Sequence, residues 1–192
     1  MKNAFLVIGL GNPGAAYTGT PHNIGRDFLI HSLTQHLETS WKSHALLLAD
    51  TASFTLNGTP VIYALPRLFM NDSGRAVFTL LKNLKITIPH CIIVHDDSDL
   101  ILGRIKVARA SRPAGHHGIE SIATILKTQE ITRIRIGVRH AHQQSQAGTF
   151  VLKRFNAAER IILIEKIYPD IENTLVSLIS KDASPSKSNR KK

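Results

Sequence analysis

The chain of 192 residues has a single cysteine, 6% aromatic residues and no apolar run of 18 or more residues. One cysteine excludes a disulfide framework, and its place in the apolar segment from Cys91 to Val94 predicts a buried thiol rather than a nucleophile. Short apolar runs do not favour a membrane span, and the N-terminus has no signal-peptide pattern. We therefore expect a cytoplasmic protein.

Acidic residues are also scarce, with 14 of them against 24 lysines and arginines, which gives a net charge of +10. Residues 1–100 are neutral overall, whereas residues 101–140 carry eight basic and two acidic side chains. These charges fall within and beside strand-like segments, so they predict a basic surface fixed to the fold and a polyanionic partner. Scattered solvated charges that serve solubility are the alternative interpretation.

The 43% hydrophobic content supports a full core, and the length fits one domain. We place this domain at residues 1–180. Residues 181–192 are basic, polar and without hydrophobic periodicity, which predicts a disordered tail. Strand-like and helix-like segments alternate, so we predict an α/β fold, a single domain with a twisted, mixed, mostly parallel β-sheet flanked by helices.

Hydrophobic periodicity places the elements along the chain. Strands are predicted at residues 5–8, 91–94, 103–108 and 133–138, and helices at 24–37 and 118–126. A turn at residues 68–74 leads to another helix with Ala76, Leu80, Leu81 and Leu84 on one face, and a further helix after residue 156 is interrupted or kinked at Pro169. Asn57-Gly58 predicts a hairpin between two strands. Asn156 and Glu159 have the spacing of a capping box.

The first strand leads into Gly9-x-Gly11-x-x-Gly14, the spacing of a dinucleotide-binding turn. In that fold a helix begins within the glycine turn and points its N-terminus at the pyrophosphate. Here the segment from Thr18 to Pro21 stops any such helix, and no clear acidic residue follows at the spacing that ribose recognition requires. The turn therefore favours a different chemistry from nicotinamide or flavin binding.

Two predicted strands end in polar groups that suit acid–base chemistry. The first leads to Asn12 and His22, and the second ends at Val94, before Asp96. A carboxylate that orients a histidine is a minimal device for activating water, and the amides of Asn12 and Asn71 are suited to polarising a carbonyl. Alternatively, His22 is only a helix-entrance residue, and the acidic cluster from Asp96 to Asp99 caps turns or binds a divalent metal.

Several motifs together resemble the bacterial-type peptidyl-tRNA hydrolase family. They are GLGNPG at residues 9–14, Tyr17, His22-Asn23, FMN-x-SG at 69–74, HDD-x-DL at 95–100, GHHG at 115–118 and RIRIG at 133–137. The resemblance runs in order from Phe5 to about Phe155. It implies a monomeric α/β enzyme, with no metal or organic cofactor, no membrane partner and no obligate protein partner, that hydrolyses the ester between a peptide and its tRNA.

The resemblance also implies roles for individual residues. His22 is the base that activates water, Asp96 orients it, and Asn12 and Asn71 position or polarise the substrate carbonyl. The predicted substrate-binding residues are Tyr17, Phe69, Met70, His116 and His117. The resemblance implies that the basic stretch at residues 101–140 binds tRNA phosphates, and we predict Lys106, Arg109, Arg133 and Arg135 as the residues that contact them.

The chain departs from the family pattern beside the predicted site. His117 stands where the family usually has asparagine, and residues 110–114 replace a glycine-rich loop. An imidazole is bulkier than an amide and titrates, so substrate affinity or pH dependence is expected to differ. These departures keep open a second hypothesis, an RNA-binding protein of the same fold that has lost hydrolysis and acts in RNA processing.

Overall fold

The computed structural model describes residues 4–36, 39–113, 115–140 and 151–183. Its centre is a seven-stranded sheet in the order β2-β3-β4-β1-β5-β7-β6. The strands are β1 (Phe5–Gly9), β2 (Lys42–His44), β3 (Ala49–Leu56), β4 (Thr59–Pro66), β5 (Cys91–Ile101), β6 (Ile105–Ala108) and β7 (Thr132–Arg139).

The sheet is mixed, as predicted, but its parallel part is smaller than expected. β1 pairs in parallel with β4 and β5, and β5 with β7. The other three pairs, β2 with β3, β3 with β4 and β6 with β7, are antiparallel. The parallel strands need helical crossovers, whereas the β3–β4 pair is the predicted hairpin, with Asn57 and Gly58 both at positive φ. Parallel pairing is thus confined to the four central strands.

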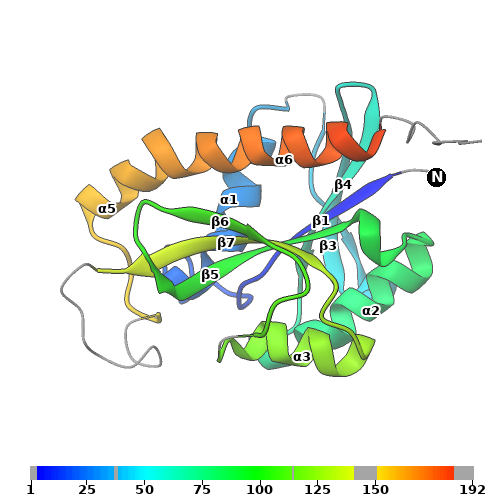
Figure 1. The fold of residues 1–192 in the computed structure, drawn as a ribbon, viewed down its shortest axis with the longest axis horizontal. Helices are drawn as coiled ribbons and strands as arrows, with labels where there is room; N and C mark the ends of the chain where they lie inside the picture. Colours follow the sequence, from blue (N-terminus) through cyan, green and yellow to red (C-terminus); the bar gives the residue numbers. More distant parts are fainter. Residues whose placement is uncertain (1–3, 37–38, 114, 141–150, 184–192) are drawn as a thin grey trace, which may run out of the picture.

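Helices cover both faces of the sheet (Figure 1). α1 (Ile24–Leu33) and α6 (Tyr168–Ala183) lie on one face, and α2 (Ser73–Leu84) and α3 (His117–Leu126) lie on the other. Alternate residues of β1 point into two separate cores, Phe5 and Val7 into the first and Leu6 and Ile8 into the second. No described helix is long and apolar enough to cross a membrane.

Close backbone contacts fix α1 against the ends of β1 and β5. Gly9 is paired with Val94, and the N–H of Leu10 donates to the carbonyl of Val94 at 3.0 Å. A Cβ atom added to Gly25 would lie 2.1 Å from that same carbonyl oxygen. Only glycine fits there, so the first turn of α1 sits directly against the sheet. This contact places the residues that precede α1, Pro21–Asn23, beside the paired end of β1 and β5.

The C-terminal helical region contains the predicted capping box and interruption. The Asn156 side chain accepts from the N–H of Glu159, whose carboxylate accepts from the N–H of Asn156, at the start of α5 (Ala157–Ile162). A π-helical turn, Leu163–Ile167, then separates α5 from α6, just before Pro169. α6 ends at Ala183, three residues past the predicted domain boundary, and the rest of the predicted tail lies outside the described residues.

Candidate active site

His22 and Asp96 are in direct contact, although 74 positions separate them in the sequence. His22 lies on the 3₁₀ turn Pro21–Asn23 before α1, and Asp96 lies on β5, two residues beyond the last pairing with β1. His22 Nδ1 is 3.0 Å from Asp96 Oδ1 and 3.2 Å from Oδ2. An ionised carboxylate only accepts hydrogen bonds, so Nδ1 donates and Nε2 keeps its lone pair. This is the arrangement of an oriented base.

The strand that carries Asp96 is longer than predicted. We expected it to end at Val94, but β5 continues to Ile101 because β7 pairs with it beyond the end of β1, with a register shift between Asp97 and Ile101. Asp96 therefore lies within a paired strand, opposite Ile136, and is only 3% exposed. A second neighbouring strand holds the carboxylate in place.

His116 contacts the same carboxylate from the other face of the sheet. Its Nε2 is 2.9 Å from Asp96 Oδ1. Its Nδ1 accepts from the backbone N–H groups of Gly118 and Ile119, at 3.1 and 3.3 Å, and so caps the N-terminus of α3. We had predicted His116 to bind substrate, but it is 9% exposed and both ring nitrogens are engaged within the protein.

A third histidine, His95, is buried beside this cluster. Its Nδ1 is 2.6 Å from the carbonyl oxygen of Asp96, while its Nε2 is buried with no hydrogen-bond partner. Its ring packs edge-on against His116, with centroids 4.7 Å apart. Burial, with the positive charge of Arg133 acting in the same direction, lowers the pKa of His95 well below its ordinary value. His95 is therefore a neutral packing partner, which the sequence did not identify.

Burial and hydrogen bonding set the ionisation of the dyad. Burial opposes the charge on Asp96, but the His116 and His22 donors outweigh it and hold the pKa of this carboxyl well below its usual range. Burial alone lowers the pKa of His22, yet the hydrogen bond and the charge of Asp96 prevail and raise it. Asp96 is thus an anion that strengthens His22 as a base.

Hydrogen bonds to Asn23 and Met70 hold Asn12 in place. Its backbone N–H donates to Asn23 Oδ1 at 2.8 Å, and its carbonyl accepts from Asn23 Nδ2 at 2.9 Å. Its side-chain Oδ1 accepts from the N–H of Met70 at 2.8 Å. Because Oδ1 is engaged, Nδ2 is the group of Asn12 that remains for donating to a substrate. Asn23, directly after His22, is a positioning residue that we had not singled out for a role.

The predicted substrate-binding residues near the turn differ in exposure and contacts, and the backbone N–H of Met70 is the group that contacts Asn12. Met70 is 5% exposed, and its neighbour Asn71 is exposed on the 3₁₀ turn Met70–Asp72. Tyr17 and Phe69 form an edge-to-face pair with centroids 6.2 Å apart, and Phe69 is 53% exposed. The structure thus brings these two aromatic rings together from separate loops.

His117 points away from the Asp96 cluster. Its side chain is 78% exposed, and its Nδ1 lies 3.6 Å from Glu120 Oε2 on the next turn of α3. The substitution that departs from the family pattern therefore leaves the hydrogen bonds of Asp96 unaffected. Its predicted role in binding substrate stays a prediction.

The four predicted phosphate ligands differ in accessibility. Lys106 and Arg109 are exposed. Arg133 is 3% exposed, and its guanidinium donates to the carbonyls of Ser111 and Arg112 at 2.7 and 3.2 Å. Arg135 forms an ion pair with Asp97. Arg133 and Arg135 are thus engaged within the protein, which the alternating strand pattern did not reveal.

Metal binding was an alternative for the acidic cluster. Among the described residues, one set of histidines and carboxylates brings its donor atoms within 4.8 Å of one another, namely His22, Asp96 and His116. Both imidazoles direct a ring nitrogen at the carboxylate over hydrogen-bond distances, and Asp99 of the predicted acidic cluster is not in the set. The contacts of this set are those of a hydrogen-bonded cluster.

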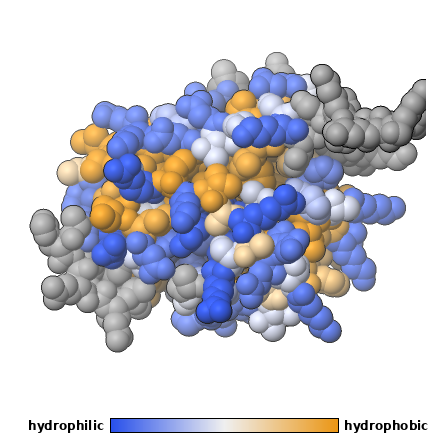
Figure 2. All heavy atoms as spheres, in the orientation of Figure 1, coloured by the Kyte–Doolittle hydropathy of each residue, from blue (hydrophilic) through white to orange (hydrophobic). Residues whose placement is uncertain are grey.

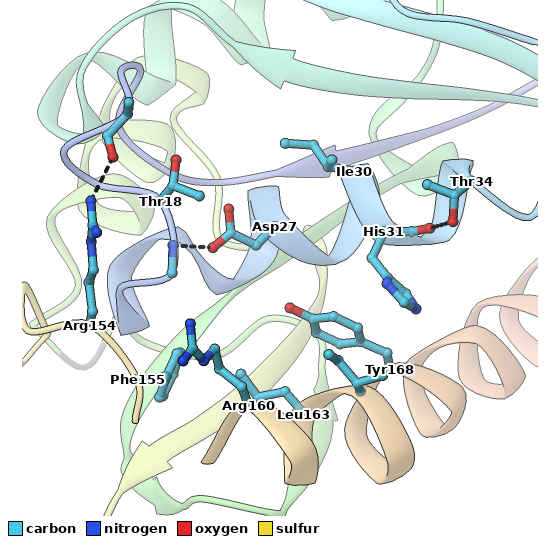
Figure 3. Close-up of a pocket in the computed structure, with 13 residues that line it drawn as sticks. Thr18, Asp27, Ile30, His31, Thr34, Arg154, Phe155, Arg160, Leu163 and Tyr168 are labelled. Carbon is cyan, nitrogen blue, oxygen red and sulfur yellow. Dashed lines mark hydrogen bonds between the residues drawn. The ribbon is translucent and has the colours of Figure 1, made fainter. Parts of the chain in front are cut away.

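A groove of about 750 Å³ lies between α1 and the helices from α5 to α6, with Ala15, Thr18 and Gly19 of the loop before α1 also in its lining (Figure 3). Its walls include Ile30, Leu163 and Tyr168, and Asp27 accepts from the N–H of Gly19 there at 2.8 Å. Figure 2 shows apolar groups gathered over the α5 end of the molecule, where Ile161 and Ile164 are at least half exposed. Neither His22 nor Asp96 lines this groove, so it is separate from the candidate active site.

Comparison with known proteins places this geometry in a family. A family model described as peptidyl-tRNA hydrolase matches residues 6–192. The chain belongs to the peptidyl-tRNA hydrolase family. It is 38% identical over 161 residues to the peptidyl-tRNA hydrolase of Mycolicibacterium gilvum and 37% identical over 161 residues to that of Mycobacterium tuberculosis, with 83% of each chain covered.

Solved structures support the same membership. The peptidyl-tRNA hydrolase of Acinetobacter baumannii superposes with a TM-score of 0.83 at 26% identity, over 95% of this chain and 92% of that one. A peptidyl-tRNA hydrolase in complex with N-propanol gives the same TM-score. The resemblance inferred from the sequence motifs is therefore confirmed, and the mixed sheet is that of the family.

Proposed function

We propose that the chain hydrolyses the ester bond between the peptide and the tRNA of peptidyl-tRNA, with water as the nucleophile. The observation that carries the proposal is the contact of His22 Nδ1 with Asp96 at 3.0 Å, which leaves Nε2 as an oriented base. Asp96 stabilises the imidazolium that forms when Nε2 takes a proton from water. Membership of the family supplies the substrate class.

The neighbouring amides have matching roles in this proposal. Asn12 Nδ2 donates to the ester carbonyl as negative charge develops on its oxygen, and Asn71 assists from the adjacent turn. Tyr17 and Phe69 form an apolar contact for the peptide, with Met70 behind them and His117 at the margin. Asn12 and Tyr17 come from the loop after β1, and Phe69, Met70 and Asn71 come from the loop after β4; the parallel pairing of the two strands places these loops at one edge of the sheet.

The tRNA is proposed to lie against the exposed cations of the β6 region. Lys106 and Arg109 contact phosphates directly, which gives affinity and register without reading bases. Arg133 acts indirectly, because its hydrogen bonds hold residues 111 and 112 of the loop that follows Arg109. Arg135 is held by its ion pair with Asp97, so it adds to the positive electrostatic potential of the surface rather than donating directly to a phosphate.

The proposed enzyme is monomeric and cytoplasmic and needs no metal or organic cofactor. The RNA-binding alternative is less favoured, since the His22–Asp96 contact and the hydrogen bond between Asn12 and Met70 are arrangements that binding alone does not require. Sedimentation at assay concentration tests the monomer. Tight RNA binding without turnover would instead support the alternative.

The decisive experiment measures release of peptide from peptidyl-tRNA in the presence of EDTA. We expect activity from the wild type and a loss of about 10²- to 10⁴-fold in His22→Ala, the usual contribution of a general base. His44→Ala, which removes an exposed histidine on β2, is the matched control. A wild type that is inactive both with and without EDTA, or an active His22→Ala variant, would refute the catalytic assignment, whereas wild-type activity that is lost only in EDTA would indicate a metal.

A further inference from the structure

We infer that His116 is a positioning residue whose fixed tautomer locks Asp96 and thereby makes His22 Nε2 the single working base of the cluster. The inference deepens the proposed function and rests on it. It assigns His116 to the support of the dyad, in place of the substrate contact that the sequence predicted. The hydrogen bonds of the His116 ring are the evidence for this inference.

The tautomer of His116 follows from its partners. Backbone N–H groups only donate, so the two that approach Nδ1, from Gly118 and Ile119, require a lone pair on that nitrogen. The ring proton therefore resides on Nε2, which faces Asp96 Oδ1 at 2.9 Å. His116 is thus a neutral donor to the carboxylate, and the N-terminus of α3 fixes its orientation.

This donor shares an oxygen of Asp96 with His22. Asp96 Oδ1 accepts from both rings, at 3.0 Å from His22 and 2.9 Å from His116. The two rings belong to the ends of helices on opposite faces of the sheet, with centroids 5.0 Å apart. Rotation of the carboxylate would break one of these bonds, so the pair holds it in the orientation that His22 requires.

The other ionisable groups near the cluster leave this assignment unchanged. His95 on β5 uses Nδ1 towards the carbonyl of Asp96, which leaves its buried Nε2 beside the His116 ring. Asp97, also on β5, is paired with Arg135 of β7. Arg133 of β7 binds the loop at Ser111. Of the three histidines, His22 is the one whose free nitrogen serves as a base.

Two isosteric substitutions separate the two functions of the His116 ring. The amide oxygen of asparagine reaches the place of Nδ1, so His116→Asn keeps the helix cap and removes the donor to Asp96. The amide nitrogen of glutamine reaches the place of Nε2, so His116→Gln keeps the donor and removes the cap. His44→Asn, at an exposed site on β2, controls for the chemical change.

We expect His116→Asn to lower kcat about 10- to 100-fold, the usual effect of removing a supporting hydrogen bond, with little change in KM. The acid limb of its pH profile moves to higher pH, because Asp96, with one donor fewer, acts more strongly on His22. His116→Gln retains the wild-type kcat and pH profile but loses about 3 °C in Tm, as expected for a lost cap.

Three results would overturn the inference: wild-type kcat in His116→Asn, a rise of KM alone in that variant, or an equal loss of kcat in both variants. A measurement without substrate separates the inference from the proposed function. In ¹⁵N–¹H correlation spectra of histidine-labelled protein at pH 7.5, His116 should give the Nε2–H tautomer, and His116→Asn should raise the titration midpoint of His22. An Nδ1–H signal for His116, or an unchanged midpoint, would refute it even in a protein that does not hydrolyse peptidyl-tRNA.

Discussion

Replacing Asp96 by asparagine tests the electrostatic basis of the site, because the change keeps the volume of the side chain and removes its charge. Asp96 is 3% exposed and accepts from both imidazoles, so its charge acts on His22 with little screening by solvent. During water attack His22 becomes an imidazolium, which the carboxylate stabilises and the amide does not. The variant should therefore fold and fail in the chemical step.

The size of the effect follows from the geometry. The two groups are in hydrogen-bond contact, with roughly 4 Å between their centres of charge, and at an effective dielectric constant near 20 the attraction is about 4 kcal/mol. Since about 1.4 kcal/mol corresponds to a tenfold change in rate, kcat should fall about 10³-fold. KM should change little, because the lost interaction develops in the transition state.

The pH dependence of this variant has a definite sign. In the wild type the charge and hydrogen bond of Asp96 raise the pKa of His22 against the opposing effect of burial. The proposed mechanism requires neutral His22, so we expect activity to be lost as the pH falls through that pKa. Without the carboxylate charge, burial prevails and the pKa of His22 drops, so the acid limb moves to lower pH.

The assay is single-turnover hydrolysis of peptidyl-tRNA between pH 5 and 9. Asp99→Asn is the matched control, since it makes the same chemical change on the same strand at an exposed position. We expect the control to keep the wild-type rate. Retention of a tenth or more of the wild-type kcat in Asp96→Asn, or an acid limb that does not move, would refute the dyad.

Two further variants test the fold and the RNA surface. Gly25→Ala should lower the free energy of unfolding by about 3 kcal/mol or more in urea titrations, because its Cβ would lie 2.1 Å from the Val94 carbonyl oxygen; a loss below about 1 kcal/mol would contradict the tight contact of α1 with the sheet. The double variant Lys106→Ala, Arg109→Ala should raise KM, leave kcat unchanged and lower the slope of log affinity against log salt by about two. An unchanged KM would place the tRNA on another surface.

Local patterns predicted the elements that depend on local interactions. The Asn57-Gly58 hairpin forms because both residues adopt positive φ, and the capping box at Asn156 and Glu159 closes within one helical turn. Cys91 is buried as expected, and burial raises the pKa of its thiol to about 12. Each of these features is decided within a few residues, so the sequence contains the information.

Pairing between distant strands was harder to predict. β2 is a three-residue edge strand whose residues are all exposed, so no hydrophobic alternation marks it. Periodicity suggested a helix to residue 37, but α1 ends at Leu33. The N–H groups of residues 34–36 instead donate to the carbonyls three residues earlier, as in turns. β5 extends past Val94 because β7 continues to pair with it. These outcomes depend on neighbours that the sequence does not identify.

The difference between predicted and observed roles at the site has the same origin. Residue type correctly suggested that His22 and Asp96 belong together, but an imidazole has two nitrogens, and its role depends on what each one meets. The backbone donors of α3 take Nδ1 of His116, and the carbonyl of Asp96 takes Nδ1 of His95. The three histidines therefore have different hydrogen-bond partners, and His22 is the one that we propose as the base. In that proposal, backbone geometry as well as residue identity decides which imidazole has a nitrogen left for chemistry.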